Sequence, residues 1–267
     1  PEYTERIHKL LGEILDYYTL KDALHDDHLC PFDYHVHTIS LTKKEQAEYD
    51  ILRAKMKKAL VMRKKGEPMS EYAEKLIYKS RGIIRGAEDK MPEAVDILKS
   101  KFEEGQHWII YCDSGKMMAE LSDMIQERMR ISPLHYWSGM DRFERKETLG
   151  FFKRNGGIII AIKCLDEGVD VPAISHGIVL SSSKTKREWI QRRGRLLRKS
   201  KTKDKSVIFD VLALPSSYGE EVSFVMDEVK RAKEFSNSSL NQIEVEYEID
   251  KICREYNINL DWVLDDK

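Results

Sequence analysis

The chain has 267 residues, a formal net charge of −1 at pH 7, a hydrophobic fraction of 41% and a charged fraction of 34%. This length can hold one large or two modest domains with a packed core, and the charge content favours long solvated helices beside a compact lobe. A net charge near zero excludes a chain that attracts polyanions over its whole surface, so any affinity for nucleic acid has to come from a local basic patch.

The sequence has no apolar run of membrane length and no signal peptide, so no membrane partner is expected. Its four cysteines are scattered without a C-x-x-C pair, which indicates reduced thiols in a cytoplasmic protein, or a nuclear one in a eukaryote. The first residue is Pro1 rather than methionine, and we therefore expect a piece of a longer protein.

The first part of the chain is predicted to be mainly helical. Residues 1–20 carry apolar side chains at helical spacing, and Tyr34 to Leu41 is rich in residues that favour strands. Thr42 and Glu45 form the pattern of a capping box before a helix from about Lys43 to Lys65. Two more helices are expected, from Ser70 to about Lys90 and from Pro92 to Glu104.

Short apolar segments and helices then alternate, which is typical of βαβ units in a parallel sheet. The expected strands are His107–Cys112, Leu134–Trp137, Gly157–Ile162, Gly177–Leu180 and Ser206–Leu212, and the expected helices are Ser114–Met129, Asp141–Arg154 and Lys184–Lys199. Two helices, Tyr218–Phe235 and Gln242–Tyr256, are predicted to follow.

These elements divide the chain into three parts. Residues 1–98 are expected to form a linker strand and a helical region, residues 99–215 an α/β domain, and residues 216–267 a helical tail. The strand at Val36–Leu41 is a candidate for an additional strand of the central sheet.

The most informative segment is Gln191 to Arg198, which reads Q-x-x-G-R-x-x-R. On a helix, Gln191, Arg195 and Arg198 share one face, and Gly194 leaves room for a phosphate or another backbone. Two guanidinium groups one turn apart match the charge of a transferring phosphoryl group. The alternative is a solvated or nonspecific basic face, because residues 184–205 contain eleven Lys and Arg against two acids.

A second segment runs from Cys164 to Pro172, directly after the strand that ends at Ile162. Gly168 permits close approach of the backbone to a ligand. Asp170 is suited to accept hydrogen bonds from a ribose hydroxyl or from an arginine of the first segment.

Polar and cationic residues follow three of the expected strands. Ser114, Arg142 and Lys163 come after the strands that end at Cys112, Trp137 and Ile162. Because the ends of parallel strands meet at one edge of a sheet, these residues are expected to converge there, where they would suit phosphate groups. For Ser114 the alternative is a simple helix cap, and for Trp137 base stacking competes with burial in the core.

Together these segments resemble motifs IV, IVa, V and VI of the superfamily 2 helicases and translocases. The resemblance is strongest to XPB-like DNA helicases and restriction-system motor subunits of the DEAD/DEAH group, and it covers roughly Trp108 to Val211. It implies the second RecA-like lobe of such a motor, which works on DNA. Arg195 and Arg198 would be arginine fingers oriented by Gln191, Gly168 and Asp170 would contact the nucleotide, and Ser114, Arg142, Lys163 and Cys164 would contact nucleic acid.

The sequence contains no G-x-x-x-x-G-K-[ST] phosphate-binding loop. The resemblance implies that ATP and Mg²⁺ are held mainly by an N-terminal RecA-like lobe of the same protein, and that this chain alone is inactive as an ATP hydrolase. The alternative function is a non-catalytic nucleic-acid-binding or scaffold module derived from the same lobe.

Two further patterns point to other sites, and we interpret both as structural. Phe224 to Glu228 has the form of an apolar strand ending in a magnesium-binding acid, but its apolar spacing also suits a helix. Five potential metal ligands crowd between residues 25 and 37 without the spacing of a zinc finger, so no metal site is expected. They are His25, His28, Cys30, His35 and His37.

Overall fold

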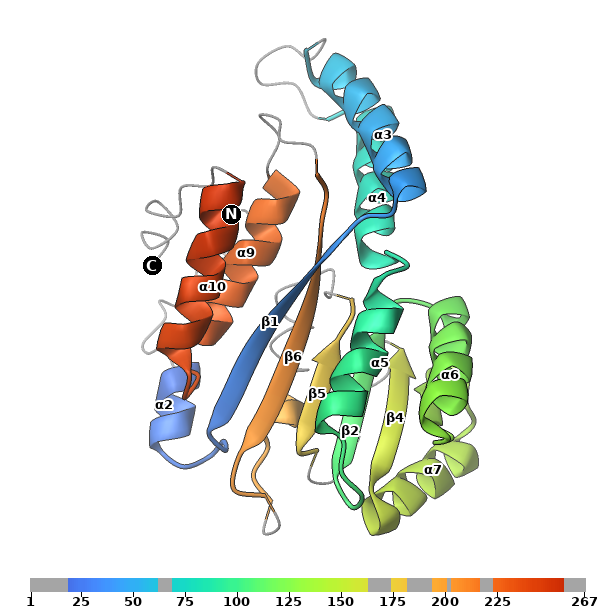
Figure 1. Ribbon diagram of the computed structural model, residues 1–267, viewed down its shortest axis with the longest axis vertical. Helices are drawn as coiled ribbons and strands as arrows, with labels where there is room; N and C mark the ends of the chain where they lie inside the picture. Colours follow the sequence, from blue (N-terminus) through green and yellow to red (C-terminus); the bar gives the residue numbers. More distant parts are fainter. Residues whose placement is uncertain are drawn as a thin grey trace, which may run out of the picture.

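The computed structural model describes residues 19–61, 69–162, 174–181, 194–200, 203–216 and 223–256. A parallel sheet crosses the molecule, and helices cover both of its faces (Figure 1). Within the described part of the chain, no helix combines the length and the apolarity that crossing a membrane requires.

The sheet has six strands in the order β1-β6-β5-β2-β4-β3, and every pair is parallel. The strands are β1 (Phe32–Ser40), β2 (His107–Cys112), β3 (Leu134–Trp137), β4 (Gly157–Ile162), β5 (His176–Val179) and β6 (Ser206–Leu214). This arrangement confirms the predicted α/β class and all five strands expected after residue 106, with bounds that differ by at most two residues.

The candidate strand near residue 36 does join the sheet. It forms the edge strand β1, which pairs with β6 over nine register positions from Phe32 opposite Ser206 to Ser40 opposite Leu214. On its outer side, the backbone N–H of Tyr34 donates to the side-chain oxygen of Asn241, and the side-chain amide of Asn241 donates back to the Tyr34 carbonyl. The chain around residue 241 therefore shields part of this edge, which would otherwise be open to other strands.

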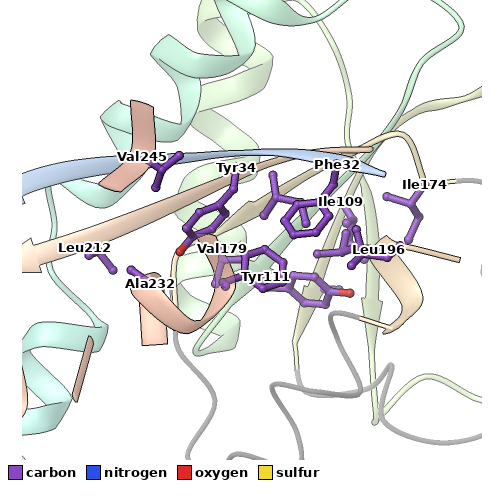
Figure 2. Packing of buried hydrophobic residues seen from close by; sticks show 14 of the residues in the cluster. Phe32, Tyr34, Ile109, Tyr111, Ile174, Val179, Leu196, Leu212, Ala232 and Val245 are labelled. Carbon is purple, nitrogen blue, oxygen red and sulfur yellow. The ribbon is translucent and has the colours of Figure 1, made fainter. Parts of the chain in front are cut away.

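The four inner strands, β2, β4, β5 and β6, are buried on both faces, which explains why they are almost continuously apolar, whereas the edge strands β1 and β3 are only partly buried. One face packs against α5 (Lys90–Lys101) and α6 (Gly115–Met129). The other face packs against α9 (Ser223–Ser236) and α10 (Gln242–Glu255) through the cluster drawn in Figure 2, in which Tyr34 and Leu212 lie beside Ala232 and Val245. The described helices of the predicted tail thus share one core with the sheet, while the domain boundaries themselves stay a prediction.

The remaining helices are α2 (Leu20–His25), α3 (Lys43–Val61), α4 (Glu71–Arg85) and α7 (Arg142–Asn155). Helices α3 and α4 form a pair that projects beyond the sheet (Figure 1). The predicted capping box is confirmed, because the Thr42 N–H donates to Glu45 Oε2 at 2.9 Å and the Glu45 N–H donates to Thr42 Oγ1 at 3.3 Å. Residues 1–18 and 62–68 lie outside the described part of the chain.

Three predicted helix bounds, in two helices, were wrong. Helix α4 stops at Arg85, with Gly86 as its C-cap, instead of continuing to Lys90. Helix α5 begins at Lys90, two residues before Pro92, and ends at Lys101 instead of Glu104. Proline is compatible with the first turn of a helix, where its missing N–H has no intrahelical partner, so it marks a helix start only to within a few residues.

The two patterns interpreted as structural have structural partners. Residues 224–228 belong to α9, which confirms the helical alternative, and Glu228 Oε2 lies 2.9 Å from Arg231 Nη2 of the same helix. His35 stacks on Phe209 with ring centroids 5.2 Å apart, and His37 Nδ1 lies 2.6 Å from Glu93 Oε1. Among the described residues, no group of three or more His, Cys, Asp and Glu side chains is arranged to hold a metal ion.

A buried lysine connects α5 to the end of β5. Lys90 is 2% exposed, and its Nζ donates a hydrogen bond of 2.6 Å to the Leu180 carbonyl. Burial lowers the pKa of Lys90 from 10.5 to about 8, although the carboxylates of Glu228 and Asp210 oppose this shift. The folded chain thus releases this proton at a lower pH than the unfolded chain does.

We expect the contribution of Lys90 to stability to increase as the pH rises from about 8 to 10.5. In this window the unfolded state binds more protons at Lys90 than the folded state, so folding becomes more favourable with rising pH. Urea unfolding should therefore show the wild-type chain gaining on the order of 3 kcal/mol relative to Lys90→Met across the window. Cys112, whose pKa burial raises to about 12, titrates in both proteins. Taking the difference between their free energies of unfolding at each pH removes this shared contribution. A difference that does not change with pH would contradict the expectation.

Candidate nucleic-acid and nucleotide interface

The carboxyl edge of the sheet, where the parallel strands end, brings three strand ends into one row. Cys112, Ile162 and Trp137 are register partners at the ends of β2, β4 and β3. Ser114 follows the first of these strands as the N-cap of α6, Arg142 follows the third as the first residue of α7, and both are exposed. The structure therefore brings Ser114 and Arg142 to the same edge, as the sequence predicted.

Four other predicted site residues lie outside the described part of the chain. They are Lys163, Cys164, Gly168 and Asp170. Lys163 follows Ile162 directly in the sequence, and Ile162 is the middle member of the row of strand ends.

The helix-cap alternative for Ser114 is confirmed. Its Oγ accepts a hydrogen bond of 3.3 Å from the backbone N–H of Met117, which is the usual geometry of an N-cap serine. A hydroxyl that accepts one bond keeps its own O–H as a donor. Capping α6 is therefore compatible with a contact from the same side chain to a phosphate oxygen.

The turn after β3 is held by a side chain that the sequence did not single out for this role. The backbone N–H of Met140 donates to the Trp137 carbonyl at 3.2 Å and closes the turn. Arg145 clamps it from α7, because its Nε donates to the Met140 carbonyl at 2.9 Å and its Nη2 to the Ser138 carbonyl at 2.6 Å. Although Arg145 is a cation near the start of α7, like Arg142, its guanidinium contacts backbone carbonyls.

A second polar cluster lies at the ends of β2 and β5. Ser181 Oγ donates to Asp113 Oδ1 at 3.2 Å, and Arg85 Nε of α4 lies 3.7 Å from the same oxygen. With the bond from Lys90 to Leu180, these contacts fix the chain where it leaves β5 towards residues 182–193. No sequence motif indicated this cluster, because its members are far apart in the chain.

The arginine segment lies near the amino edge of the sheet, where the strands begin. Gly194, Arg195 and Leu196 are helical, but the helix ends there, so the prediction of a helix to Lys199 was wrong. Arg198 instead forms an antiparallel bridge with Leu29, and the Leu197 carbonyl accepts a hydrogen bond of 2.8 Å from the Cys30 N–H. Pairing with the chain that enters β1 thus replaces the last helical turn.

Arg195 and Arg198 are consequently not presented from one continuous helix. Arg195 is half-buried and Arg198 is exposed. Gln191, the third member of the predicted face, lies outside the described residues. A Cβ atom at Gly194 would meet open space, which agrees with the expected uncrowded surface at this position.

Lys203 anchors this segment, although in the sequence it is only one member of a basic run. Its buried Nζ donates to the Leu196 carbonyl at 2.8 Å and to the Ile174 carbonyl at 2.9 Å, and burial lowers the pKa of Lys203. The Leu196 carbonyl also accepts a bond of 2.6 Å from Ser206 Oγ. Lys203 therefore connects Ile174 to Leu196, the residue directly after Arg195.

A glycine allows the same leucine to pack on the sheet. A Cβ atom at Gly177 of β5 would lie 2.6 Å from Leu196 Cδ2, closer than such atoms can approach. Leu196 itself is 1% exposed. Arg195 thus lies between Gly194, which leaves space around it, and Leu196, which is fixed through its side chain and its carbonyl. Such a preorganised backbone suits an arginine that stabilises charge.

Comparison with known proteins agrees with this geometry. Residues 89–200 match the helicase conserved C-terminal domain family. A DNA 3'-5' translocase XPB2 from Sulfurisphaera tokodaii is 28% identical over 224 residues, which cover 77% of this chain and 45% of that protein. The chain thus spans less than half the length of this curated relative.

Two solved structures share the fold. The SWI2/SNF2 ATPase C-terminal domain from Sulfolobus solfataricus matches 85% of this chain and 100% of its own length, with a TM-score of 0.50 and 13% identity. The SWI2/SNF2 ATPase core from the same organism, in complex with double-stranded DNA, matches 97% of this chain and 56% of its own length, with a TM-score of 0.55 and 12% identity.

The domain match over residues 89–200 spans β2, β3, β4 and β5 together with Ser114, Arg142 and the arginine segment up to Arg198. Residues 89–200 are thus a helicase conserved C-terminal domain, and the described part of the chain has the RecA-like fold of such domains.

Proposed function

We propose that the chain is the C-terminal motor lobe of an ATP-dependent DNA helicase or translocase. In this proposal Arg195 and Arg198 act as arginine fingers oriented by Gln191, and Gly168 and Asp170 contact the nucleotide. Ser114, Arg142, Lys163 and Cys164 contact the DNA backbone. The supporting observation is the division of the lobe into two edges, with an anchored arginine segment at the amino edge and exposed strand ends at the carboxyl edge.

The described residues fit one side of a nucleotide site. Arg195 and Arg198 supply cations that suit phosphate oxygens, but the sequence has no phosphate-binding loop to hold ATP by itself. ATP and Mg²⁺ would be held mainly by an N-terminal RecA-like lobe of the same protein, and the bound nucleotide would supply the phosphoryl group for hydrolysis. This chain would contribute the arginines, and closure of the two lobes would bring those arginines to the phosphates.

The DNA partner is supported by the translocase relative and by the solved core that holds double-stranded DNA. The competing proposal is a nucleic-acid-binding scaffold without turnover. The anchoring of Leu196 favours the motor, because simple binding to a polyanion does not need a fixed backbone beside one arginine.

Salt-dependent binding of DNA to the 267-residue chain tests the carboxyl edge. Each neutralised phosphate releases condensed counterions, so Arg142→Ala and Lys163→Ala are each expected to lower the slope of log K against log salt by about one unit or less. Both changes should weaken all DNA sequences alike. Fluorescence anisotropy with labelled duplex and single strands at several salt concentrations measures the slope.

Lys251→Ala is the matched control, because Lys251 is an exposed lysine on α10 and should leave the slope unchanged. If both variants at the carboxyl edge keep the wild-type slope, the phosphate-binding groove lies elsewhere. The most plausible other location is the basic helices between Lys43 and Lys90.

A further inference from the structure

One aromatic side chain at the carboxyl edge has no place in the phosphate contacts proposed above. Trp137 is the last residue of β3 and remains 36% exposed, although tryptophan is usually well buried. The preceding residue of the strand, Tyr136, points to the opposite face and is fully buried. Packing of the core therefore explains Tyr136 but leaves a part of the Trp137 ring in solvent.

The ring is held by a rigid turn. Three hydrogen bonds fix residues 137–140, two of them from Arg145. At Gly139, an added Cβ atom would lie 2.8 Å from Trp137 Nε1 and 3.1 Å from Cδ1. The indole thus lies directly against the glycine, and any side chain at this position would displace it.

The surroundings of Trp137 combine aromatic surface with positive charge. Arg142 is exposed in the first turn of α7, and beside it Phe143 is 72% exposed. Proteins that bind single-stranded nucleic acid combine cations that follow the phosphates with aromatic rings on which bases stack. A base in a continuous duplex already stacks on its neighbours, so only an unpaired base can offer a free face to such a ring.

We propose that Trp137 is a stacking platform for an unpaired base of the DNA strand that lies along the carboxyl edge, with Phe143 as an additional aromatic contact. This inference rests on the proposed function, and it narrows the substrate of the lobe to DNA with a single-stranded region. The fixed turn lowers the entropic cost of stacking, because the ring is already in place before the DNA binds.

Oligonucleotides with and without bases separate stacking from phosphate binding. The 267-residue chain is titrated with a fluorescent thymidine single strand, with an abasic strand of equal length and charge, and with a blunt duplex. Trp137→Ala is expected to weaken binding of the thymidine strand about 5- to 100-fold and to leave the abasic strand and the duplex within about twofold. Its salt slope should equal that of the wild type, because no phosphate contact is removed.

Two variants keep the test valid if Trp137→Ala unfolds. Trp137→Phe retains a ring and should stay within about threefold of the wild type on the thymidine strand. Gly139→Ala keeps the tryptophan but displaces it, so it should reproduce most of the loss. The matched control is Phe151→Ala, which removes a 50% exposed ring near the other end of α7 and should have no effect.

The outcomes also distinguish this inference from the proposed function. If Trp137→Ala weakens the abasic and the thymidine strands equally, or neither of them, the stacking role is wrong while DNA binding stands. If the wild-type chain binds none of the three DNAs, the DNA partner in the proposed function is wrong. Equal binding of Gly139→Ala and the wild type to the thymidine strand would also overturn the stacking role.

Discussion

Replacing Arg195 or Arg198 by alanine, in a protein that joins this chain to the proposed N-terminal lobe, is expected to reduce ATP turnover on the order of a thousandfold or more, with a much smaller change in ATP affinity. An arginine finger stabilises charge that develops on the phosphoryl group during transfer, so its loss affects the rate more than the binding of the ground state. The two arginines occupy different settings, since Arg195 precedes the anchored Leu196 whereas Arg198 pairs with Leu29. We expect both variants to show the loss, and DNA-stimulated steady-state kinetics measures it.

Lys199→Ala is the matched control for this experiment. Lys199 is an exposed neighbour of Arg198 that forms an ion pair with Asp27, and its loss should leave turnover within a few-fold of the wild type. The 267-residue chain alone should show no turnover, because it has no phosphate-binding loop. Near wild-type turnover in both arginine variants would mean that the pair is only a basic patch. DNA-stimulated turnover by the chain alone would contradict the proposal that ATP is held mainly by the N-terminal lobe.

The second large effect is expected on stability, at an ion pair in the core between β6 and α9. Asp210 is 1% exposed, and both of its carboxylate oxygens accept hydrogen bonds from Arg231 Nη2, at 3.1 and 3.0 Å. The Tyr34 hydroxyl also donates to Asp210 Oδ2 at 2.8 Å. Burial raises the pKa of Asp210, and the guanidinium of Arg231 opposes this shift.

Arg231→Met should therefore destabilise the chain by about 3 to 5 kcal/mol, because it leaves the Asp210 carboxylate buried without its cation. Urea unfolding followed by circular dichroism gives the free energy of unfolding. Lys205→Met is the matched control, since it breaks a 2.6 Å pair with Asp33 whose lysine is 53% exposed, and it should cost about 1 kcal/mol or less. Equal losses in the two variants would show that the buried pair carries no special weight.

Adding Asp210→Leu to Arg231→Met should recover part of the loss. The second change removes one of the two carboxylates that lose their cation, while Glu228, whose Oε2 lies 2.9 Å from Arg231 Nη2, still lacks it. Recovery is expected to be partial for this reason, although buried ion pairs replaced by apolar residues often regain stability. If the double variant is as unstable as the sum of the single changes, the loss comes from packing of the arginine stem and not from the uncompensated charge.

The local sequence determined most of the elements of this fold. Apolar runs such as Trp108 to Cys112 predicted buried parallel strands, because both of their faces have to be covered. Thr42 and Ser70 marked the starts of helices, because their side chains satisfy backbone N–H groups only a few residues away. The placement of Ser114 and Arg142 at one edge followed from the parallel sheet alone.

Tertiary structure decided how distant segments meet, and the local pattern does not contain this information. Arg198 lies outside the helix and forms an isolated bridge with Leu29, which is far away in the sequence. Nothing in the local sequence around Lys203, Asp210 and Arg145 indicates their partners, and only the fold shows that they bind carbonyls or an opposite charge. Burying a charged group is costly unless it finds such partners, so the folded chain places each of these charges beside a group that satisfies it. The spacing of apolar residues predicts helices and strands, but it does not specify which distant groups come together.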